Sequence, residues 1–322
     1  MFPQQPIWSN TRVDLLQRCP RAFVLRYGVA QLSQNHPKGQ ALSEIFQIQT
    51  PWVLLHQTIR ETVLEYVEDY ANGTIWSTGL LFTKFKHGFT QLIRKRNQLI
   101  KRIMETGLIS QPGFQCTQVE AHLIEMGTNL CIDLIHHPEF VRILEVGTIK
   151  RLEPTDSIHQ QNVRIYNAPD MMHFNNDQQF LIKIHPFQQR PKPELELQAS
   201  LLQLYGDEKT TIVFFHLSKR AWSCRKIIPN PTQKNQAMGI VGQDIKHMMN
   251  AFYSVGKHND LSKVPLADSR RSCMHCNVQS LCPTRDGYER AKAEQRALMC
   301  QKGTSIVEYI SVSYTHLRAH ET

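Results

Sequence analysis

Three cysteines near the end of the chain, Cys273, Cys276 and Cys282, follow the spacing C-x2-C-x5-C, and a fourth, Cys19, stands in a Cys-Pro-Arg triplet far upstream. Four thiolates can complete the coordination of one zinc ion or one iron–sulfur cluster. A site built from these residues would hold the two ends of the chain together around everything between them. This constraint restricts the fold more than any other feature of the sequence.

The distribution of the four cysteines bears on the metal that they would bind. Zinc modules usually contain two local pairs of ligands, whereas here one ligand is distant and three are close together. The arrangement favours a [4Fe–4S] cluster, with zinc as the alternative. Four unrelated buried cysteines are the competing interpretation, because free cysteine is a common core residue. The polar sequence around the triplet, RRSCMHCNVQSLCPTR, argues against simple core packing.

The composition describes a globular protein with a core of ordinary size. The 322 residues are 41% hydrophobic and 20% charged, no apolar run is long enough to cross a membrane, and no secretory signal opens the chain. We therefore expect a cytoplasmic protein without a membrane partner, in which metal ligation explains clustered cysteines better than disulfides do. Cys116, Cys131 and Cys224 lie in apolar, strand-like runs and are expected in the core, whereas Cys300 lies on a charged helix over 286–301.

Basic residues outnumber acidic ones, and the formal net charge is +9. Such a balance favours polyanionic partners. The cations concentrate in the segment 84–102, which contains no acid and carries apolar residues at helical spacing. We expect a helix with one buried and one basic face. The basic face is either an ordinary solvated surface or a surface that contacts phosphates.

The order of the expected elements indicates the fold class. Helices are expected over 11–29, with a break where Pro20 follows Cys19, and over 51–70, which opens on a proline. Short apolar runs then predict strands at 115–126, 129–137, 141–149, 163–174 and 178–187, with a turn at 127–129 and a hairpin tip at 175–177. A helix (194–206), a strand (210–218) and a helix (235–254) follow. The pattern predicts an α/β fold with a mixed central sheet flanked by helices and a helical annex.

We expect four regions along the chain. They are an N-terminal helical region (1–110), an α/β core (111–260), a C-terminal cysteine cluster with its helix (261–303) and a tail (304–322). The last residues, VSYTHLRAHET (312–322), resemble a translated sequencing-adaptor tail and are excluded from the fold argument. We therefore expect the natural C-terminus to differ from the one printed.

Six pieces of the chain occur in an order that resembles a known family. They are Cys19-Pro20-Arg21, His56 in WVLLHQTIRE, Pro169-Asp170 in NAPDMMHF, Lys183 in FLIKIH, Gln198 in ELQASLLQLY, and the final cysteine triplet. Together, over roughly residues 8–285, they resemble the PD-(D/E)XK nuclease superfamily in its RecB-like branch with an iron–sulfur cluster. That branch includes the AddB helicase-nuclease subunit and exonucleases of CRISPR adaptation. The resemblance implies a restriction-endonuclease-like core and a helical annex that is held together by the four cysteines and the metal group they bind.

The resemblance also implies metal-dependent hydrolysis of DNA. A Mg²⁺ or Mn²⁺ ion would activate water and stabilise the charged transition state. Asp170 and His56 would be metal ligands, because hard cations prefer oxygen ligands and a histidine often joins them in this family. Lys183 would orient the attacking water or neutralise charge, and Gln198 would complete the catalytic set. DNA is the expected partner, together with a helicase or another DNA-processing protein.

The sequence departs from the family pattern at its most important position. The acid of the acid-x-lysine motif should stand at 181, where this chain has Leu181, which offers no oxygen. The tyrosine expected four residues after the glutamine is replaced by Leu202, with Tyr205 nearly one turn later. One explanation is an inactive nuclease fold kept for binding nucleic acid or a partner, with a purely structural cluster. The other is an acid that has migrated, with candidates Glu194, Glu196, Glu61 and Glu65.

A second register of the motif is possible, with Asp133 and Glu145 as the acid pair, but it places Gly147 at the lysine position. We prefer Asp170 and Lys183 because the step from the lysine to Gln198 is short, as in the family. His56 and Asp170 have structural alternatives, namely a satisfied core histidine and an ordinary turn residue. Lys183 is harder to explain structurally, since an inward-facing lysine on a central strand is costly without a partner.

Overall fold

The computed structural model describes residues 6–32, 37–106, 120–153, 155–175, 178–188, 192–218, 221–255, 260–267, 269, 272–273, 276, 278 and 282. Its helices are α1 (Asn10–Arg18), α2 (Pro20–Val24), α3 (Ala30–Leu32), α4 (Pro37–Ile45), α5 (Pro51–Ala71), α6 (Thr78–Glu105), α7 (Glu120–Ile135), α8 (Pro138–Glu145), α9 (Lys192–Leu202) and α10 (Pro231–Ser254), with short helical turns η1 (Leu25–Val29), η2 (Gln203–Tyr205) and η3 (Leu261–Lys263). Its strands are β1 (Ile7–Trp8), β2 (Thr148–Arg151), β3 (Ile158–Gln160), β4 (Val163–Ile165), β5 (Met171–Asn175), β6 (Gln178–Gln188), β7 (Thr211–Ser218) and β8 (Ala221–Ile227). Within this part of the chain, no helix has the length and apolar character needed to span a membrane.

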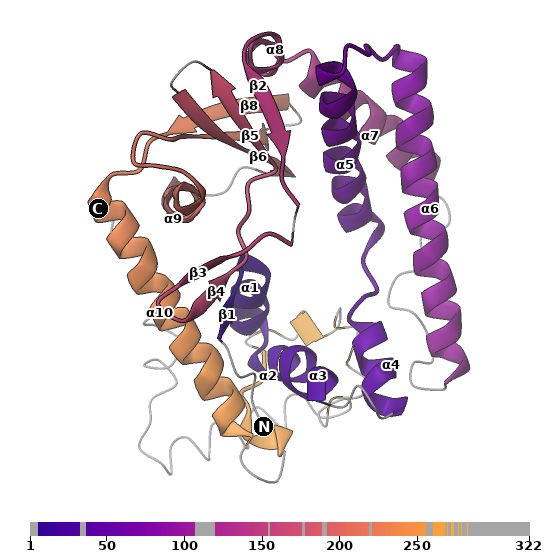
Figure 1. Ribbon diagram of the computed structural model, residues 1–322. Helices are drawn as coiled ribbons and strands as arrows, with labels where there is room; N and C mark the ends of the chain where they lie inside the picture. Colours follow the sequence, from indigo (N-terminus) through magenta and orange to yellow (C-terminus); the bar gives the residue numbers. More distant parts are fainter. Residues whose placement is uncertain are drawn as a thin grey trace.

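The expected α/β class with a mixed sheet flanked by helices is confirmed (Figure 1). The larger sheet has the order β2-β5-β6-β7-β8, in which β6 and β7 are parallel and the other neighbours are antiparallel. Strands β5 and β6 form the expected hairpin, since Asn175 pairs with Gln178. A smaller sheet, β1-β4-β3, lies apart from it, and its strand β1 runs parallel to β4.

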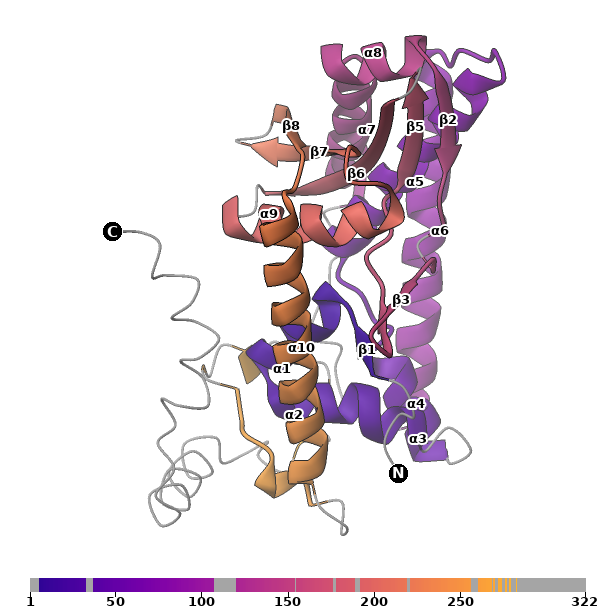
Figure 2. The ribbon, with the colours of Figure 1, turned by 60° about the vertical axis from the view of Figure 1, so that its left-hand side comes forward.

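The two faces of the larger sheet are covered by different helices. Side chains from α5, α7 and α8 pack on one face in a cluster that includes Ile59, Leu134 and Ile182. Helix α9 packs on the opposite face, where Leu195 meets Phe214 of β7. Figure 2 shows this layered arrangement, with α9 on one side of the sheet and α5 and α7 on the other. Side chains on β6 therefore point into two separate environments, because successive residues of a strand face opposite ways.

Three of the expected strands are wrong. The residues from Glu120 to Glu145 form helices α7 and α8, and a strand begins only after them, at Thr148–Arg151. The buried residues of α7 recur at helical spacing, at Leu123, Gly127 and Cys131. The expected turn at 127–129 lies inside α7, where a Cβ on Gly127 would overlap the ring of Phe85. This glycine allows α6 and α7 to approach closely, and does not end an element.

The break expected after Cys19 is confirmed. Helix α1 ends and helix α2 begins at this residue, whose backbone is extended with φ −160° and ψ 100°. Pro20 takes the first position of α2, where its missing N–H would have no helical partner. The two short helices pack on α10, and the Phe23 and Phe252 ring centroids lie 5.0 Å apart. Trp8 adds a polar link to the same helix, because its Nε1 donates to Asp244 at 2.9 Å.

Candidate functional site

Asp170 lies immediately before β5 and is almost fully buried, with 3% of its surface exposed. Its backbone continues the sheet on both sides, since its N–H donates to Ile182 O at 2.8 Å and its carbonyl accepts from Leu152 N–H at 3.1 Å. Its carboxylate enters the space between β5 and β6, where Oδ2 accepts the Ile184 N–H at 2.7 Å. Asp170 is therefore held at backbone and side chain alike, which excludes an ordinary exposed turn residue.

Lys183 projects from β6 away from the buried side chains of Ile182 and Ile184, as the alternation of the strand predicts. Its Nζ donates to Ala168 O at 2.6 Å and to Asp170 Oδ1 at 3.0 Å. The structure thus brings the predicted lysine and aspartate into direct contact. Charge compensation by Asp170 explains how a lysine with 17% side-chain exposure is accommodated on a central strand.

The side chain of Leu181 points to the same face of β6 as that of Lys183. It lies two residues earlier on the strand, where α9 covers the sheet. It is fully buried in an apolar cluster whose other members are Leu195, Ala199, Leu202, Ile212 and Phe214. The position of the missing acid is therefore a packed core position, and a carboxylate there would be desolvated without an evident partner.

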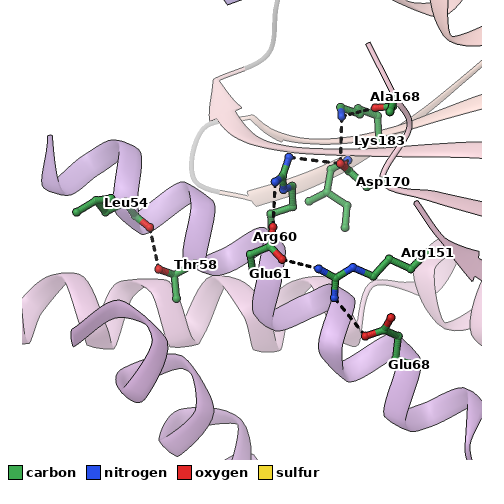
Figure 3. A network of polar contacts seen from close by, with 10 residues as sticks. Leu54, Thr58, Arg60, Glu61, Glu68, Arg151, Ala168, Asp170 and Lys183 are labelled. Carbon is green, nitrogen blue, oxygen red and sulfur yellow. Dashed lines mark hydrogen bonds and ion pairs between the residues drawn. The ribbon is translucent and has the colours of Figure 1, made fainter. Parts of the chain in front are cut away.

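Arg60 of α5 was not expected from the sequence, although it lies one helical turn after His56. Its Nη1 lies 3.6 Å from Asp170 Oδ1, and its Nη2 lies 2.9 Å from Glu61 Oε1 (Figure 3). The same Glu61 pairs with Arg151 of β2 at 2.7 Å, and Arg151 pairs with Glu68 at 3.2 Å. Asp170 thus stands at one end of a row of alternating charges that runs along α5.

The four candidates for a migrated acid have different surroundings. Glu61 pairs with Arg60, which also pairs with Asp170. Glu65 forms an ion pair with Lys84 of α6. Glu194 and Glu196 lie on α9, and Glu196 pairs with a lysine one turn earlier on that helix. Glu61 is therefore linked to the predicted site through Arg60.

Gln198 contacts β6 through His185, a residue that the sequence did not predict to belong to the site. The Oε1 of Gln198 lies 3.1 Å from His185 Nε2, and the His185 ring stacks on Phe214 with centroids 5.7 Å apart. His185 and Lys183 are two residues apart on β6 and face the same way. Tyr205 points elsewhere, because its hydroxyl donates to Asp156 O at 3.1 Å, and burial raises its pKa to about 12.

The alternative register with Asp133 and Glu145 is wrong. Both residues are exposed and lie on helices, Asp133 on α7 and Glu145 at the end of α8. An acid pair on neighbouring strands cannot form from these positions. The preferred register is the one in which the structure joins an aspartate to a lysine.

His56 lies on α5, half-buried, and burial lowers its pKa to about 4. A neutral imidazole is the form that binds metal ions. The position is thus compatible with either interpretation from the sequence, a ligand or a core histidine.

We expect this histidine to make the fold sensitive to acid. The unfolded chain binds a proton on His56 below about pH 6.5, whereas the folded chain resists protonation until about pH 4, so stability falls as pH drops through this window. After allowance for solvent screening, the effect is about 1–2 kcal/mol. Urea unfolding between pH 7 and pH 5 in EDTA should show a smaller loss for His56→Gln than for the unmodified chain. His87→Gln, on the exposed face of α6, is the matched control and should leave the loss unchanged.

The four cysteines form the second candidate site. Burial, and to a smaller extent the neighbouring thiols of Cys19, Cys282 and Cys273, raise the pKa of Cys276 to about 11. The other three thiols are thus near enough to Cys276 to influence its charge. Among the described residues, no group of three or more His, Cys, Asp or Glu side chains is compact enough to be recognised as a metal site.

Hydrogen-bond donors surround these sulfurs. Ala22 N–H donates to Cys19 Sγ at 3.4 Å, at the N-terminus of α2. Arg21 is buried, with 3% exposure, and its Nη1 lies 3.9 Å from Cys282 Sγ. The same guanidinium donates to Val264 O at 2.8 Å and to Ser262 O at 3.2 Å. A buried cation and N–H groups beside the sulfurs suit thiolates, whereas burial raises the pKa of Cys19 and Cys276 and favours the neutral thiol in the absence of a metal ion. The donors present are those that would offset the charge of metal-bound thiolates.

The other cysteines behave as core residues where they are described. Cys131 is fully buried on α7, and burial raises its pKa. Cys224 of β8 is half-buried against the same cluster, and burial raises its pKa to about 11. Cys131 is thus in the core as expected, although on a helix. Cys116 and Cys300 lie outside the described residues.

The chain matches no protein-family model and no curated protein. Among solved structures, the crystal structure of SSO0001 aligns with a TM-score of 0.26 and 10% identity, covering 52% of this chain and 80% of that one. A likeness this weak carries no argument about fold family or function.

Proposed function

We propose that this chain is a DNA-binding protein of the RecB-like PD-(D/E)XK type, with a restriction-endonuclease-like core, in which internal cations replace the catalytic metal ion. The contact between Asp170 at a strand start and Lys183 on its hairpin partner supports the family assignment, because the resemblance implies this juxtaposition. The net charge of +9 supports a polyanionic partner.

The contacts of the Asp170 carboxylate are the observation that supports a loss of catalysis in this proposal. The Asp170 carboxylate is already occupied by Lys183, by Arg60 and by a backbone N–H of β6. A divalent cation prefers several oxygen ligands, yet the neighbouring family position holds the buried Leu181. A metal ion beside Asp170 would also meet the repulsion of two cationic side chains.

The four thiols, in this proposal, hold a structural [4Fe–4S] cluster, with zinc as the alternative. When bound, either group cross-links the start of α2 to the segment after α10. The N–H groups at Cys19 and the guanidinium of Arg21 offset the negative charge of the thiolates. We assign the group no step in a reaction.

The proposal is tested by assaying cleavage and binding together. We expect no turnover of single- or double-stranded DNA with Mg²⁺ or Mn²⁺, and salt-sensitive binding of the same DNA. Cleavage that is lost in Lys183→Gln, with the variant shown to be folded by circular dichroism, would overturn the silent assignment. Absence of DNA binding in low salt would overturn the function itself.

Metal-dependent phosphodiester hydrolysis is the second candidate, and the position of Arg60 favours it. The guanidinium lies between the carboxylates of Asp170 and Glu61, one turn from His56, where a divalent cation could lie if the arginine side chain moved away. Such a cation would have the two carboxylates as oxygen ligands, which hard divalent cations prefer.

Replacing Arg60 separates the two candidates. We expect Arg60→Gln to bind Mn²⁺ at least about tenfold more tightly than the unmodified chain, because one positive charge between two carboxylates is removed. Isothermal titration with Mn²⁺ measures the change. Arg142→Gln, which removes an exposed ion pair with Glu139, is the control and should have no effect. Mn²⁺-dependent cleavage that increases in Arg60→Gln would favour hydrolysis, whereas tighter Mn²⁺ binding without cleavage supports the silent assignment.

A further inference from the structure

The solvent face of α6 carries cations that the protein leaves uncompensated. Lys86, Arg94 and Lys101 are exposed, and no described carboxylate forms an ion pair with them. Elsewhere on the same helix, Lys84 pairs with Glu65 and Arg102 pairs with Glu44. Acids are thus available to neighbouring cations of α6 but not to these three.

The three cations lie on one stripe. They are eight and seven residues apart, which places them about 10–12 Å apart along the axis and within about 80° of arc. No acid occurs from Thr78 to Met104, and the residues beside the stripe include the polar His87, Gln91 and Gln98. The stripe therefore carries no negative charge and is able to donate hydrogen bonds.

The first cation of the stripe is accompanied by an exposed aromatic ring. Phe82 is 41% exposed, and Lys86 Nζ lies 5.7 Å from its ring centroid. Helix α6 lies at the outer edge of the molecule in Figure 1, and the three cations on it are exposed. An exposed ring next to a row of cations is the combination by which proteins hold single strands, with bases stacked on the ring and phosphates on the cations.

We propose that this face of α6 binds a single strand of DNA, with Lys86, Arg94 and Lys101 on the phosphates and Phe82 stacked on a base. The inference rests on the proposed DNA-binding function and assigns it a surface. That surface is separate from the contacts of Asp170, since Lys86, Arg94 and Lys101 are exposed and their stripe is centred about 100° around the helix from the buried residues Phe85, Phe89 and Ile93.

The test compares two triple variants that remove the same charge. In Lys86→Gln/Arg94→Gln/Lys101→Gln, affinity for single-stranded DNA should fall more than about tenfold, and the slope of log K against log salt should become shallower by about 2, which is three contacts at about 0.7 each. In Lys150→Gln/Lys209→Gln/Lys246→Gln, which replaces three exposed lysines outside α6, the slope should stay near that of the unmodified chain. Phe82→Ala should weaken binding by about fivefold or more and leave the slope unchanged.

The outcomes distinguish three claims, namely DNA binding by the chain, the α6 surface as its site, and the preference for single strands. If the unmodified chain binds no DNA, the proposed function fails and the surface with it. If it binds but both triple variants change equally, DNA binding survives and the α6 surface is overturned. Tighter binding of duplex than of single-stranded DNA, with no effect of Phe82→Ala, would overturn the single-strand assignment.

Discussion

Replacing Cys19 with serine is expected to empty the four-cysteine site and to release both segments that it joins. A chain purified anaerobically should be brown, absorb near about 400 nm and contain about four irons, and the variant should lose all three properties. Metal binding of this kind contributes directly to folding, so hydrogen exchange in α1 and α2 should increase sharply. The larger sheet has its own apolar clusters and should stay protected.

The matched control is Cys224→Ser. This cysteine is half-buried on β8 and takes no part in the cluster, so the variant should keep its iron. Zinc without iron in the unmodified protein would replace the cluster by the alternative ion. Neither metal, with α1 and α2 equally protected in both variants, would contradict the site.

Replacing Asp170 with alanine is expected to destabilise the protein by about 3–5 kcal/mol, the usual cost of removing one partner of a buried ion pair. The substitution leaves Lys183 and Arg60 without this carboxylate, and it removes the acceptor of the Ile184 N–H. The free energy of unfolding in urea measures the loss. Asp133→Ala, at an exposed position of α7, is the control and should change stability by less than about 0.5 kcal/mol.

A second substitution distinguishes charge from packing. Adding Lys183→Met to Asp170→Ala removes one stranded cation, so the double variant should recover part of the lost stability. Asp170→Asn should cost less than Asp170→Ala, because the amide oxygen can still accept the Ile184 N–H. Additive effects in the double variant would mean that the ion pair is not formed in solution.

Local chemistry was enough to predict several elements. Pro20 forced the break at Cys19, Pro51 set the start of α5, and the alternation around Lys183 gave both the strand and the direction of the lysine. The hairpin then brought Lys183 to Asp170, because antiparallel pairing fixes which residues lie opposite each other.

Non-local packing explains the failures. The sequence of α7 contains Gly127 and Asn129, which favour turns in isolation, but the helix is stabilised by α5 and α6, and the glycine is needed where Phe85 approaches. The contact of Arg60 with Asp170 could not be predicted from the sequence for the same reason. Its role depends on how α5 is rotated against the sheet, which a helical pattern alone does not determine.

The bonds from Arg21 to the carbonyls of Ser262 and Val264 have a consequence for biosynthesis. They join residues 241 and 243 positions apart, so the segment around Arg21 leaves the ribosome long before its partners are made. Strand β1 must likewise wait for β4, and Trp8 for Asp244. Contacts this distant in sequence slow folding. Until α10 and the residues after it have been made, the apolar sides of α1 and α2 lack their native cover, which makes this nascent segment prone to aggregation and a substrate for chaperones.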